Sequence, residues 1–535
     1  MNWKKNIIVF FLMVFFINIC YPIIAKAETI PTKMEIRVGL TSMYSEKGSI
    51  TIYNEKLGYG YCIRNTYKQE VLLTSTNGFT FNAIDGYFVR ETKSYSSYQE
   101  AKIVADTYME NGIEAYVGSS YQQKWRVYFG NYATDSEAKQ IVQTVKKQDK
   151  KISLEILSGN NYRVLVTGSF GKILLDVDEN NAYPQFRPIT SYQNGVKCID
   201  MGDRVYRGRM EIGRYGKTTV TAVNILPMEE YLYSVVPAEM PATWHEEALK
   251  AQAVCARSYA LVGAGYGGAS NAKKGYNIVD TTASQVYKGF LGEDVKTKQA
   301  VDSTKGEMVY YNNKVISAYF FSTSGGSTEF AENVWGVKKA YLKSVPYFDE
   351  SDAPKISWQK IMKKEEISAL FLKKGIKIGY LSKMIPMQYS SSGRIDTMRV
   401  EGSDRFTILK GTKIRSILNL YSTKFKIVQK GDIPDTVTVL SSNGTLSKRI
   451  SEMYVASASG VEKASSKVEQ YIVQSEDNLW NYPRLAPTES TEILFAGMGY
   501  GHGIGMSQYG AKGMAEAGFT YKEIIEYYFT GAYVK

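Results

Sequence analysis

The sequence is poor in the side chains that bind zinc or form disulfide frameworks. It has only two histidines and four cysteines in 535 residues. Cys62, Cys198 and Cys255 lie far apart with no C-x-x-C pair among them, and Cys20 lies in an N-terminal apolar run. Two histidines without clustered acids cannot build a zinc amidase site, so the sequence excludes that class.

Motifs of other ligand-binding and catalytic classes are also missing. No G-x-S-x-G segment offers the nucleophile elbow of a serine hydrolase. The alternating glycines from Gly497 to Gly505 match neither the dinucleotide-binding pattern G-x-G-x-x-G nor a P-loop. The sequence therefore predicts no cofactor, and these glycines indicate instead that the backbone passes close to another segment.

The N-terminus has the pattern of an export signal. Two lysines precede an apolar run at residues 7–19, and an A-x-A cleavage site follows at 25–27. The run is shorter than the roughly 20 apolar residues of a spanning helix, although residues 7–24 would act as an anchor if left uncleaved. We predict a signal peptide at residues 1–27 and an exported protein, extracellular or associated with the cell wall or membrane.

The chain is basic, with a formal net charge of +12. For an exported protein, the anionic polymers of a cell wall are a more natural partner than nucleic acid. The 42 tyrosines and 6 tryptophans can supply flat faces for sugar rings, but tyrosine is also common in β-rich extracellular proteins.

An internal repeat follows an N-terminal β segment predicted at residues 28–83. Tyr95 and the triplet Glu100-Ala101-Lys102 recur 37 positions later. Each copy predicts strand, helix, strand, and the two together predict a β-α-β-β-α-β order over residues 84–159. The predicted structure is a four-stranded antiparallel sheet backed by two helices.

Within this repeat, FVRETKSYSSYQEAKIVADTYMENGIEAYV and WRVYFGNYATDSEAKQIV resemble the SPOR domain. The resemblance implies binding to peptidoglycan strands stripped of their peptides. An RNA-recognition module has the same order of elements, but KWRVYFGNY lacks its aromatic pattern and an exported protein meets little RNA. A ferredoxin-like spacer with a purely structural role would show the same apolar pattern.

The most constrained carboxyl group is that of Glu239, which lies between Pro237 and Pro241. Each proline disfavours helical angles in the residue before it, so we predict a rigid turn joining two helices. Bulky apolar neighbours would desolvate Glu239 and raise its pKa. The alternative is a glutamate that caps a helix and faces water.

The two flanking helices have their own signals. The first is predicted to begin near Pro227. The second has a predicted capping box of Thr243 and Glu246. Its apolar stripe, at helical spacing, consists of Ala248, Ala251, Cys255 and Tyr259.

The segment NILPMEEYLYSVVPAEMP resembles the signature of the SpoIID/LytB family, the stage II sporulation protein D and amidase-enhancer group. Four later segments match the family in order, at residues 279–289, 318–336, 341–345 and 495–531. The resemblance implies an α+β protein with a SpoIID-like catalytic domain at residues 160–535. Between the matching segments, a helical insertion is predicted at 358–374, followed by strand, short helix and strand at 393–427 and by a Ser-, Asn- and Thr-rich β insertion at 430–490. A capping box of Thr520 and Glu523 predicts a last helix that closes the fold.

The family resemblance implies a lytic transglycosylase that cuts the MurNAc–GlcNAc bond of stripped glycan strands. Glu239 matches the family's catalytic glutamate, and Arg257 matches a basic position that the family needs. A hydrolase usually needs two carboxyl groups. A lytic transglycosylase can use one, which protonates the leaving oxygen and then takes the proton from the sugar's own 6-hydroxyl.

Further substrate contacts are predicted on the matching segments. His502 would orient Glu239 or bind a sugar hydroxyl, although a lone histidine is often structural. Without the resemblance, Arg257 would be interpreted as an exposed cation at the end of a helix. Some family members bind zinc through a His-Cys pair where this chain has Ala283 and Ser284, so we predict no metal. The predicted substrate-binding residues are Arg257, Gln285, Tyr287, Tyr319, Ser324, His502, Ser507 and Gln508.

Two functions are compatible with these motifs. The first is an exported peptidoglycan lytic transglycosylase that acts after an N-acetylmuramoyl-L-alanine amidase in cell-wall remodelling, as in engulfment during sporulation. The second is a non-enzymatic wall-binding protein that stimulates such an amidase. In both, the partner is the glycan strand, and contact with the membrane is expected only through an uncleaved leader.

Overall fold

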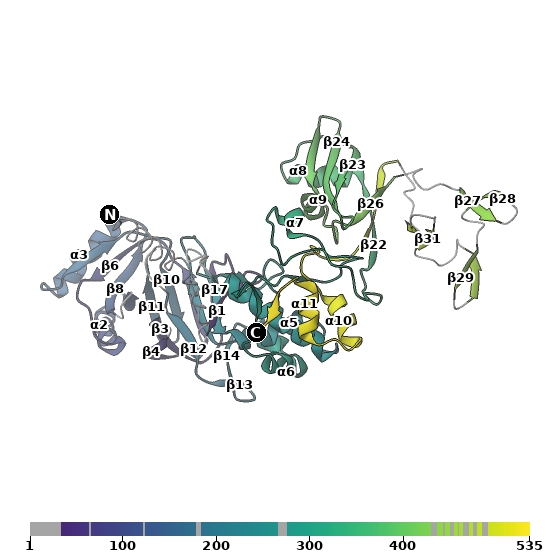
Figure 1. Cartoon of the computed structure of the whole chain (residues 1–535). Coiled ribbons are helices and arrows are strands. Elements are labelled where there is room, and N and C mark those ends of the chain that lie inside the picture. The colour runs from purple at the N-terminus through teal and green to yellow at the C-terminus, as the bar shows by residue number, and fades with distance from the viewer. Residues whose placement is uncertain are drawn as a thin grey trace, which may run out of the picture. The chain divides into compact units, whose positions relative to one another are not determined.

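The computed structural model (Figure 1) describes residues 34–429 and 490–535, apart from 64–65, 121–123, 178–182 and 266–274, and the backbone of short strands between 436 and 483. All elements below belong to the unit Glu35–Lys535. The predicted signal peptide lies outside the described residues. Within these ranges no helix is both long and apolar enough to cross a membrane. Helices and several β-sheets are combined, in agreement with the predicted α+β class.

The strand that leads into Glu239 lies in a sheet of order β18-β1-β17-β16-β12-β3-β4. β1 (Glu35–Gly39) pairs antiparallel with β17 (Thr221–Pro227), which is followed directly by the helix that ends at Glu239. The N-terminal segment therefore shares a sheet with the segment that carries the predicted acid. The remaining strands are β3 (Lys56–Ile63), β4 (Thr66–Thr74), β12 (Gln185–Pro188), β16 (Arg209–Gly213) and β18 (Ile278–Val279).

The internal repeat folds in the order of elements that its sequence predicts. Ser97 caps the first helix, and Thr134 forms a capping box with Glu137 at the second. The four strands pair antiparallel in the order β7-β8-β6-β9. In chain order the elements are β6 (Tyr87–Glu91), α2 (Tyr98–Glu110), β7 (Ala115–Ser120), β8 (Lys124–Tyr132), α3 (Asp135–Gln148) and β9 (Leu154–Leu157).

The predicted extent of this sheet, four strands, is wrong. One edge of β7 has no partner within the repeat, and β11 (Gly171–Asp176) pairs with that edge in parallel. Eight strands result, completed by β10 (Val164–Gly168), β5 (Phe79–Ala83) and β2 (Ser49–Ile52). Phe88 and Tyr128 of the repeat are fully buried, and the Tyr128 hydroxyl donates to Asp176 of β11 at 2.7 Å.

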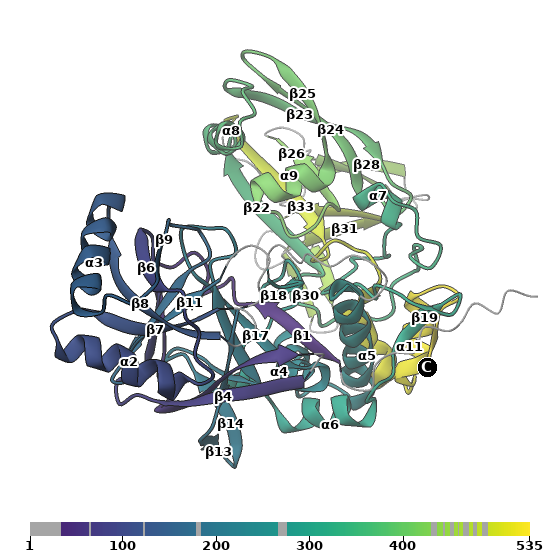
Figure 2. The same cartoon turned by 90° about the vertical axis from the view of Figure 1, so that its left-hand side faces the viewer.

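The central helix of the region around Glu239 is α5 (Glu246–Gly263). Its buried residues include Ala248, Ala251 and Cys255 of the predicted stripe. Burial on several sides is expected of a helix that is surrounded by others. α5 contacts α4 (Met228–Glu239), α6 (Val295–Ser303), α10 (Gln508–Glu516) and α11 (Tyr521–Tyr528), and Figure 2 shows it beside α4, α6 and α11.

The predicted turn around Glu239 is shorter than expected, since Pro237 lies inside the last turn of α4. At that position the proline removes only one intrahelical hydrogen bond near a helix end, where the cost is small. Met240 is the extended C-cap, and its N–H donates to Val236 O at 2.9 Å. Glu239 is therefore the last residue of a helix.

The predicted capping boxes have different outcomes. The box of Thr243 and Glu246 is wrong, because the N-cap of α5 is His245. The box of Thr520 and Glu523 is confirmed, with both reciprocal hydrogen bonds present at the start of α11.

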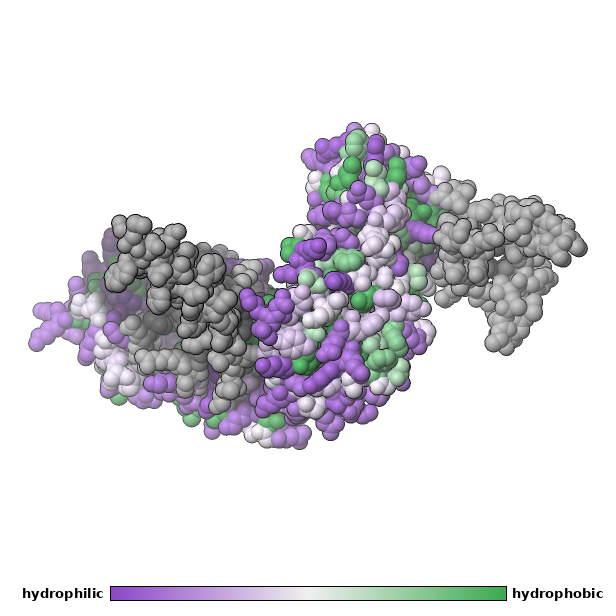
Figure 3. All heavy atoms as spheres, in the orientation of Figure 1, coloured by the Kyte–Doolittle hydropathy of each residue, from purple (hydrophilic) through white to green (hydrophobic). Residues whose placement is uncertain are grey.

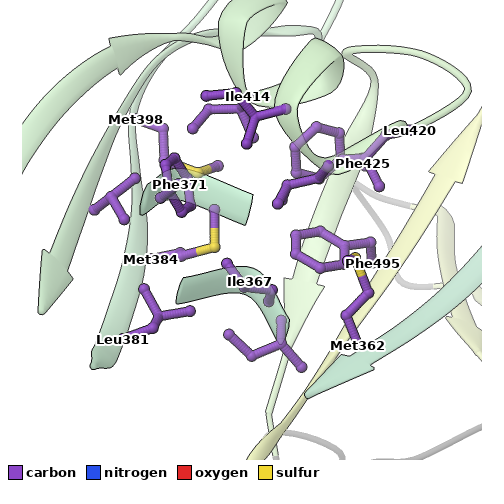
Figure 4. Close-up of a cluster of buried hydrophobic side chains, with 14 of the residues drawn as sticks. Met362, Ile367, Phe371, Leu381, Met384, Met398, Ile414, Leu420, Phe425 and Phe495 are labelled. Carbon is purple, nitrogen blue, oxygen red and sulfur yellow. The ribbon is translucent and has the colours of Figure 1, made fainter. Parts of the chain in front are cut away.

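A third group of elements lies between residues 357 and 428 and carries its own core (Figure 4). The predicted helix at 358–374 is partly wrong, because β22 (Ser357–Lys363) pairs along its whole length with β33 (Glu492–Met498) and only then does α8 (Lys364–Lys373) begin. The later order of strand, helix and strand is confirmed, except that two strands precede the helix: β24 (Ile395–Gly402), β25 (Phe406–Lys410), α9 (Gly411–Leu418) and β26 (Phe425–Val428).

The core in Figure 4 holds α9 in place. Ile414 and Leu418 of α9 are fully buried and belong to the same cluster as Phe371 of α8 and Phe495 of β33. β23 (Leu381–Tyr389) contributes Met384 to the same cluster. Because Ile414, Ile417 and Leu418 of α9 all belong to this core, the orientation of the whole helix is fixed.

The predicted β insertion at 430–490 contains three antiparallel hairpins. The hairpins are β27 (Thr436–Ser441) with β28 (Gly444–Arg449), β29 (Tyr454–Ser457) with β30 (Gly460–Lys463), and β31 (Gln470–Gln474) with β32 (Leu479–Pro483).

Figure 3 shows hydrophilic residues spread over the coloured surface of that view, with hydrophobic ones in small scattered groups.

Candidate active site

Glu239 lies at the C-terminal end of α4, half-buried, where two distant segments supply hydrogen-bond donors. The Val286 N–H donates to Glu239 Oε1 at 2.9 Å. Gln508 Nε2, at the start of α10, donates to Glu239 Oε2 at 3.4 Å and to the Glu239 carbonyl at 3.2 Å. Three segments of the family resemblance therefore meet at one carboxyl group.

Burial raises the pKa of Glu239 above its ordinary value, as the sequence predicts. The hydrogen bonds from Val286 and Gln508 and the charge of Lys288 act in the opposite direction, because each stabilises the ionised form. The net direction is upward. A larger fraction of the side chain therefore carries a proton near neutral pH than for an exposed glutamate.

Glu239 lines a pocket of about 730 Å³. Aromatic side chains form much of its wall, and Tyr319 packs on Trp335 with ring centroids 4.4 Å apart. Such flat apolar faces are suited to packing against sugar rings. The lining residues are Glu239, Tyr259, Thr282, Ala283, Ser284, Tyr319, Phe320, Phe321, Ser322, Trp335, Arg415, Tyr500, Gly501, His502 and Gln508.

The alternating glycines bring the last family segment to this pocket. β21 (Phe320–Phe321) pairs in parallel with β34 (Met506–Ser507), and Thr323 bridges Tyr500. Gly499 has a φ of +77°, and a Cβ there would lie 2.7 Å from Thr323 O. The predicted close backbone passage is confirmed, because no larger residue fits.

His502 lies in the pocket wall as a neutral side chain. Its Nδ1 accepts the Ile504 N–H at 3.0 Å, and its ring packs 5.5 Å from both Phe321 and Trp335. Burial and the positive charges of Arg415 and Arg394 lower its pKa to about 3. It therefore stays uncharged at physiological pH.

The structure brings four of the predicted residues to the pocket: Glu239, Tyr319, His502 and Gln508. It places Arg257 elsewhere. Arg257 is fully buried in α5, where Nη2 lies 2.7 Å from Glu229 Oε2 and donates to Val301 O at 3.2 Å. In this position it joins the start of α4 to the end of α6 instead of facing the pocket.

Gln285 and Tyr287 are also enclosed. Gln285 Nε2 donates to Ala256 O at 3.2 Å, and Gln285 Oε1 accepts from Tyr231 at 3.1 Å. The Tyr287 hydroxyl donates to Asn224 Oδ1 at 2.8 Å. These contacts hold the backbone on both sides of Val286, so the two side chains position the N–H that reaches Glu239.

Ser324 and Ser507 meet at a buried acid that the sequence did not single out, Glu350. Its carboxylate accepts hydrogen bonds from the hydroxyls of both serines and from the backbone N–H groups of Ser324 and Gly325. Ser507 also caps α10. A buried carboxylate with four donors is well compensated, and it ties two glycine-containing segments together behind the pocket.

Other pocket residues were not predicted as site residues. Tyr259 was placed only on an apolar stripe, and Trp335 lies within a matching segment, so the sequence offered a weak signal for both. Arg415 had none, because it lies in α9, outside the five family segments.

Fold and site together define a mixed α/β protein with an aromatic pocket in which Glu239 is the one acid among the described lining residues. A family model described as "Stage II sporulation protein" matches residues 216–311, and a "Domain of unknown function (DUF8618)" matches residues 336–445.

Relatives with known names extend this match. The chain is 32% identical over 330 residues to stage II sporulation protein D of Bacillus subtilis (strain 168), covering 59% of this chain and 77% of that protein. It is also 32% identical to the amidase enhancer of the same organism, with 56% of this chain and only 39% of that protein covered. The chain belongs to the stage II sporulation protein D family, which confirms the resemblance read from its motifs. The SPOR resemblance of residues 84–159 stays a prediction.

Proposed function

We propose that this protein is an exported lytic transglycosylase that cleaves the MurNAc–GlcNAc bond of peptidoglycan strands stripped of their peptides, during cell-wall remodelling in sporulation. The observation that carries the proposal is Glu239, a carboxyl group with a raised pKa in an aromatic pocket. Glu239 is the only acid among the described residues that line this pocket. A reaction that needs one carboxyl group fits that arrangement better than hydrolysis with two.

In the first step Glu239 acts as a general acid. Oε1 holds the short bond from Val286, so the proton belongs on Oε2, whose bond from Gln508 is longer. Transfer of this proton to the glycosidic oxygen accompanies cleavage of the bond between that oxygen and C1 of MurNAc, and the GlcNAc-terminated strand leaves as an alcohol.

In the second step the same side chain acts as a base. Val286, Gln508 and the charge of Lys288 stabilise the carboxylate that the first step leaves behind. It takes the proton from the C6 hydroxyl of MurNAc, whose oxygen bonds to C1 and closes the 1,6-anhydro ring. Glu239 ends protonated, no water is consumed, and the sugar supplies its own nucleophile at high effective concentration.

The test is mass spectrometry of fragments released from amidase-treated peptidoglycan, in which anhydro and reducing ends differ by one water. We expect Glu239→Gln to reduce release of anhydro ends by at least about a hundredfold, the usual contribution of general acid–base catalysis, while binding to glycan persists. Glu246→Gln, on the exposed start of α5, is the matched control and should cut normally. Undiminished cutting by Glu239→Gln would refute the assignment.

A second candidate is favoured by the relative named amidase enhancer. In that case the protein binds stripped strands and stimulates an N-acetylmuramoyl-L-alanine amidase without cutting them. Amidase turnover would then rise equally with the wild-type protein and with Glu239→Gln, and neither would produce anhydro ends.

Glycan binding by residues 84–159, as in a SPOR domain, is part of the proposal. Phe88 and Tyr128 are buried, so we place the binding surface at the groove of about 530 Å³ beside α2. Its lining includes Lys102 and, from the adjoining β11, Lys172, which pair with Asp106 and Glu114. In Glu239→Gln protein, added Lys102→Ala and Lys172→Ala changes should weaken sedimentation with stripped peptidoglycan. Unchanged sedimentation would contradict a binding role for this groove.

A further inference from the structure

Arg415 reaches the pocket of Glu239 from a part of the chain that the family signature does not include. It belongs to α9, which lies within the matched domain of unknown function at residues 336–445 and is anchored by Ile414 and Leu418 in the core of Figure 4. A helix held by its apolar residues presents its remaining side chains in fixed directions. Arg415 is therefore a built component of the pocket wall.

The guanidinium of Arg415 is held at one end and open at the other. Nε donates to Leu420 O at 3.3 Å and to Tyr421 O at 3.2 Å. No carboxylate of the described residues forms an ion pair with it, whereas most of the other buried or half-buried arginines around the fold have acidic partners. The two Nη groups can thus serve a ligand.

The positive charge of Arg415 acts inside the pocket. It is one of the reasons why the pKa of His502, on the same wall, is lowered. Burial lowers the pKa of Arg415 itself, which shows that its charge is partly desolvated without a compensating acid. A planar cation of this kind favours a carboxylate that can accept two parallel hydrogen bonds.

We propose that Arg415 binds the lactyl carboxylate of MurNAc and selects strands from which the peptide has been removed. This inference rests on the proposed function. In intact peptidoglycan the lactyl group is joined to the stem peptide as a neutral amide, and an amidase converts it to a free carboxylate. Arg415 gains a charged partner only in the second case, so the enzyme acts after the amidase.

The experiment compares two substrates that differ only at this group: stripped strands with free lactyl carboxylates, and the same strands after coupling of the carboxylates to methylamine. The wild-type protein should prefer the free form by about ten- to hundredfold in kcat/KM, the range expected for a hydrogen-bonded charge pair. Arg415→Gln should lose most of this preference through a higher KM, and still cut the amidated strands. Arg415→Lys should keep part of it.

Lys413→Gln, an exposed position on the same helix, is the matched control and should retain the full preference. A preference unchanged in Arg415→Gln would overturn the inference, and so would an equal loss on both substrates, which indicates a structural role. Binding of Glu239→Gln and Glu239→Gln/Arg415→Gln proteins to both strands separates the two proposals. If the wild type cuts neither strand but binding depends on Arg415 and on the carboxylate, the proposed enzyme activity fails and the carboxylate site stands.

Discussion

At the scale of single residues, the environment of Glu239 combines two opposite requirements. Burial favours the protonated form that donates a proton, and the donors from Val286 and Gln508 favour the ionised form that accepts one. A side chain poised between these effects suits the proposed reaction, which needs it first as an acid and then as a base. Burial of the ionised side chain also lowers the free energy of unfolding, and this effect can be measured without substrate.

The raised pKa of Glu239 makes stability depend on pH. Between its ordinary pKa and the raised value, the folded protein binds more protons than the unfolded chain, so stability falls as pH rises through this window. Glu239→Gln removes the cost of the buried charge while its amide oxygen can still accept from Val286. We expect the melting temperature at pH 7.5 to increase by about one to three degrees.

Differential scanning calorimetry at pH 7.5 and pH 4 tests this expectation. The gain should shrink at pH 4, where the wild-type side chain is largely protonated in both the folded and the unfolded state. A lower melting temperature for Glu239→Gln at pH 7.5 would mean that the carboxylate is stabilised by its donors more than it is penalised by burial.

At the scale of elements, the contacts of Arg257 connect three helices. Its ion pair with Glu229 links α5 to the first turn of α4, and its hydrogen bond to Val301 O links α5 to the last turn of α6. Arg257→Ala should therefore lower the free energy of unfolding by about 3 kcal/mol or more, because Glu229 loses its buried partner. Denaturant unfolding measures this directly.

A substrate-binding role for Arg257 makes a different prediction. KM would rise with little change in unfolding free energy. The double variant Arg257→Met/Glu229→Met serves as control, since replacing both partners by apolar groups should recover part of the lost stability. If Arg257 binds substrate, this double variant would still have a raised KM.

Local signals predicted the elements only in part. The capping box at Thr520 depends only on neighbouring residues, and it is present, whereas the equally local box at Thr243 is not. At β22 the local pattern failed, because pairing of Trp358 with Gly497 comes from a segment more than a hundred positions away. The candidate site shows the same difference between local and long-range signals. Glu239 was predicted from its neighbouring prolines, but the burial of Arg257 and the arrival of Arg415 depend on long-range packing.

At the scale of the whole molecule, the insertion at 430–490 interrupts two strands that are already neighbours. β26 and β33 pair antiparallel, with Val428 opposite Leu494. Replacing residues 430–489 by a short Gly-Ser linker should therefore close a hairpin, with a loop-entropy change of about 2 kcal/mol in favour of the shorter loop. The melting temperature and the cutting of glycan should both be close to those of the full chain.

Circular dichroism on heating and the fragment assay check this expectation. As a contrast, deletion of residues 34–83 should abolish cooperative unfolding, because it removes β1 from between β17 and β18. Equal tolerance of both deletions would show that β1 contributes little to the sheet.

The position of β1 also determines when the protein can fold. Its partners β17 and β18 begin about 185 and 240 positions later in the chain. β1 therefore cannot pair until most of the N-terminal half of the chain has been synthesised. Contacts of such high sequence separation slow folding, and the unpaired strand is exposed to aggregation meanwhile. If the chain is exported N-terminus first, as proposed, β1 would have both of its partners only after residue 279, just past the midpoint of the chain, has crossed the membrane.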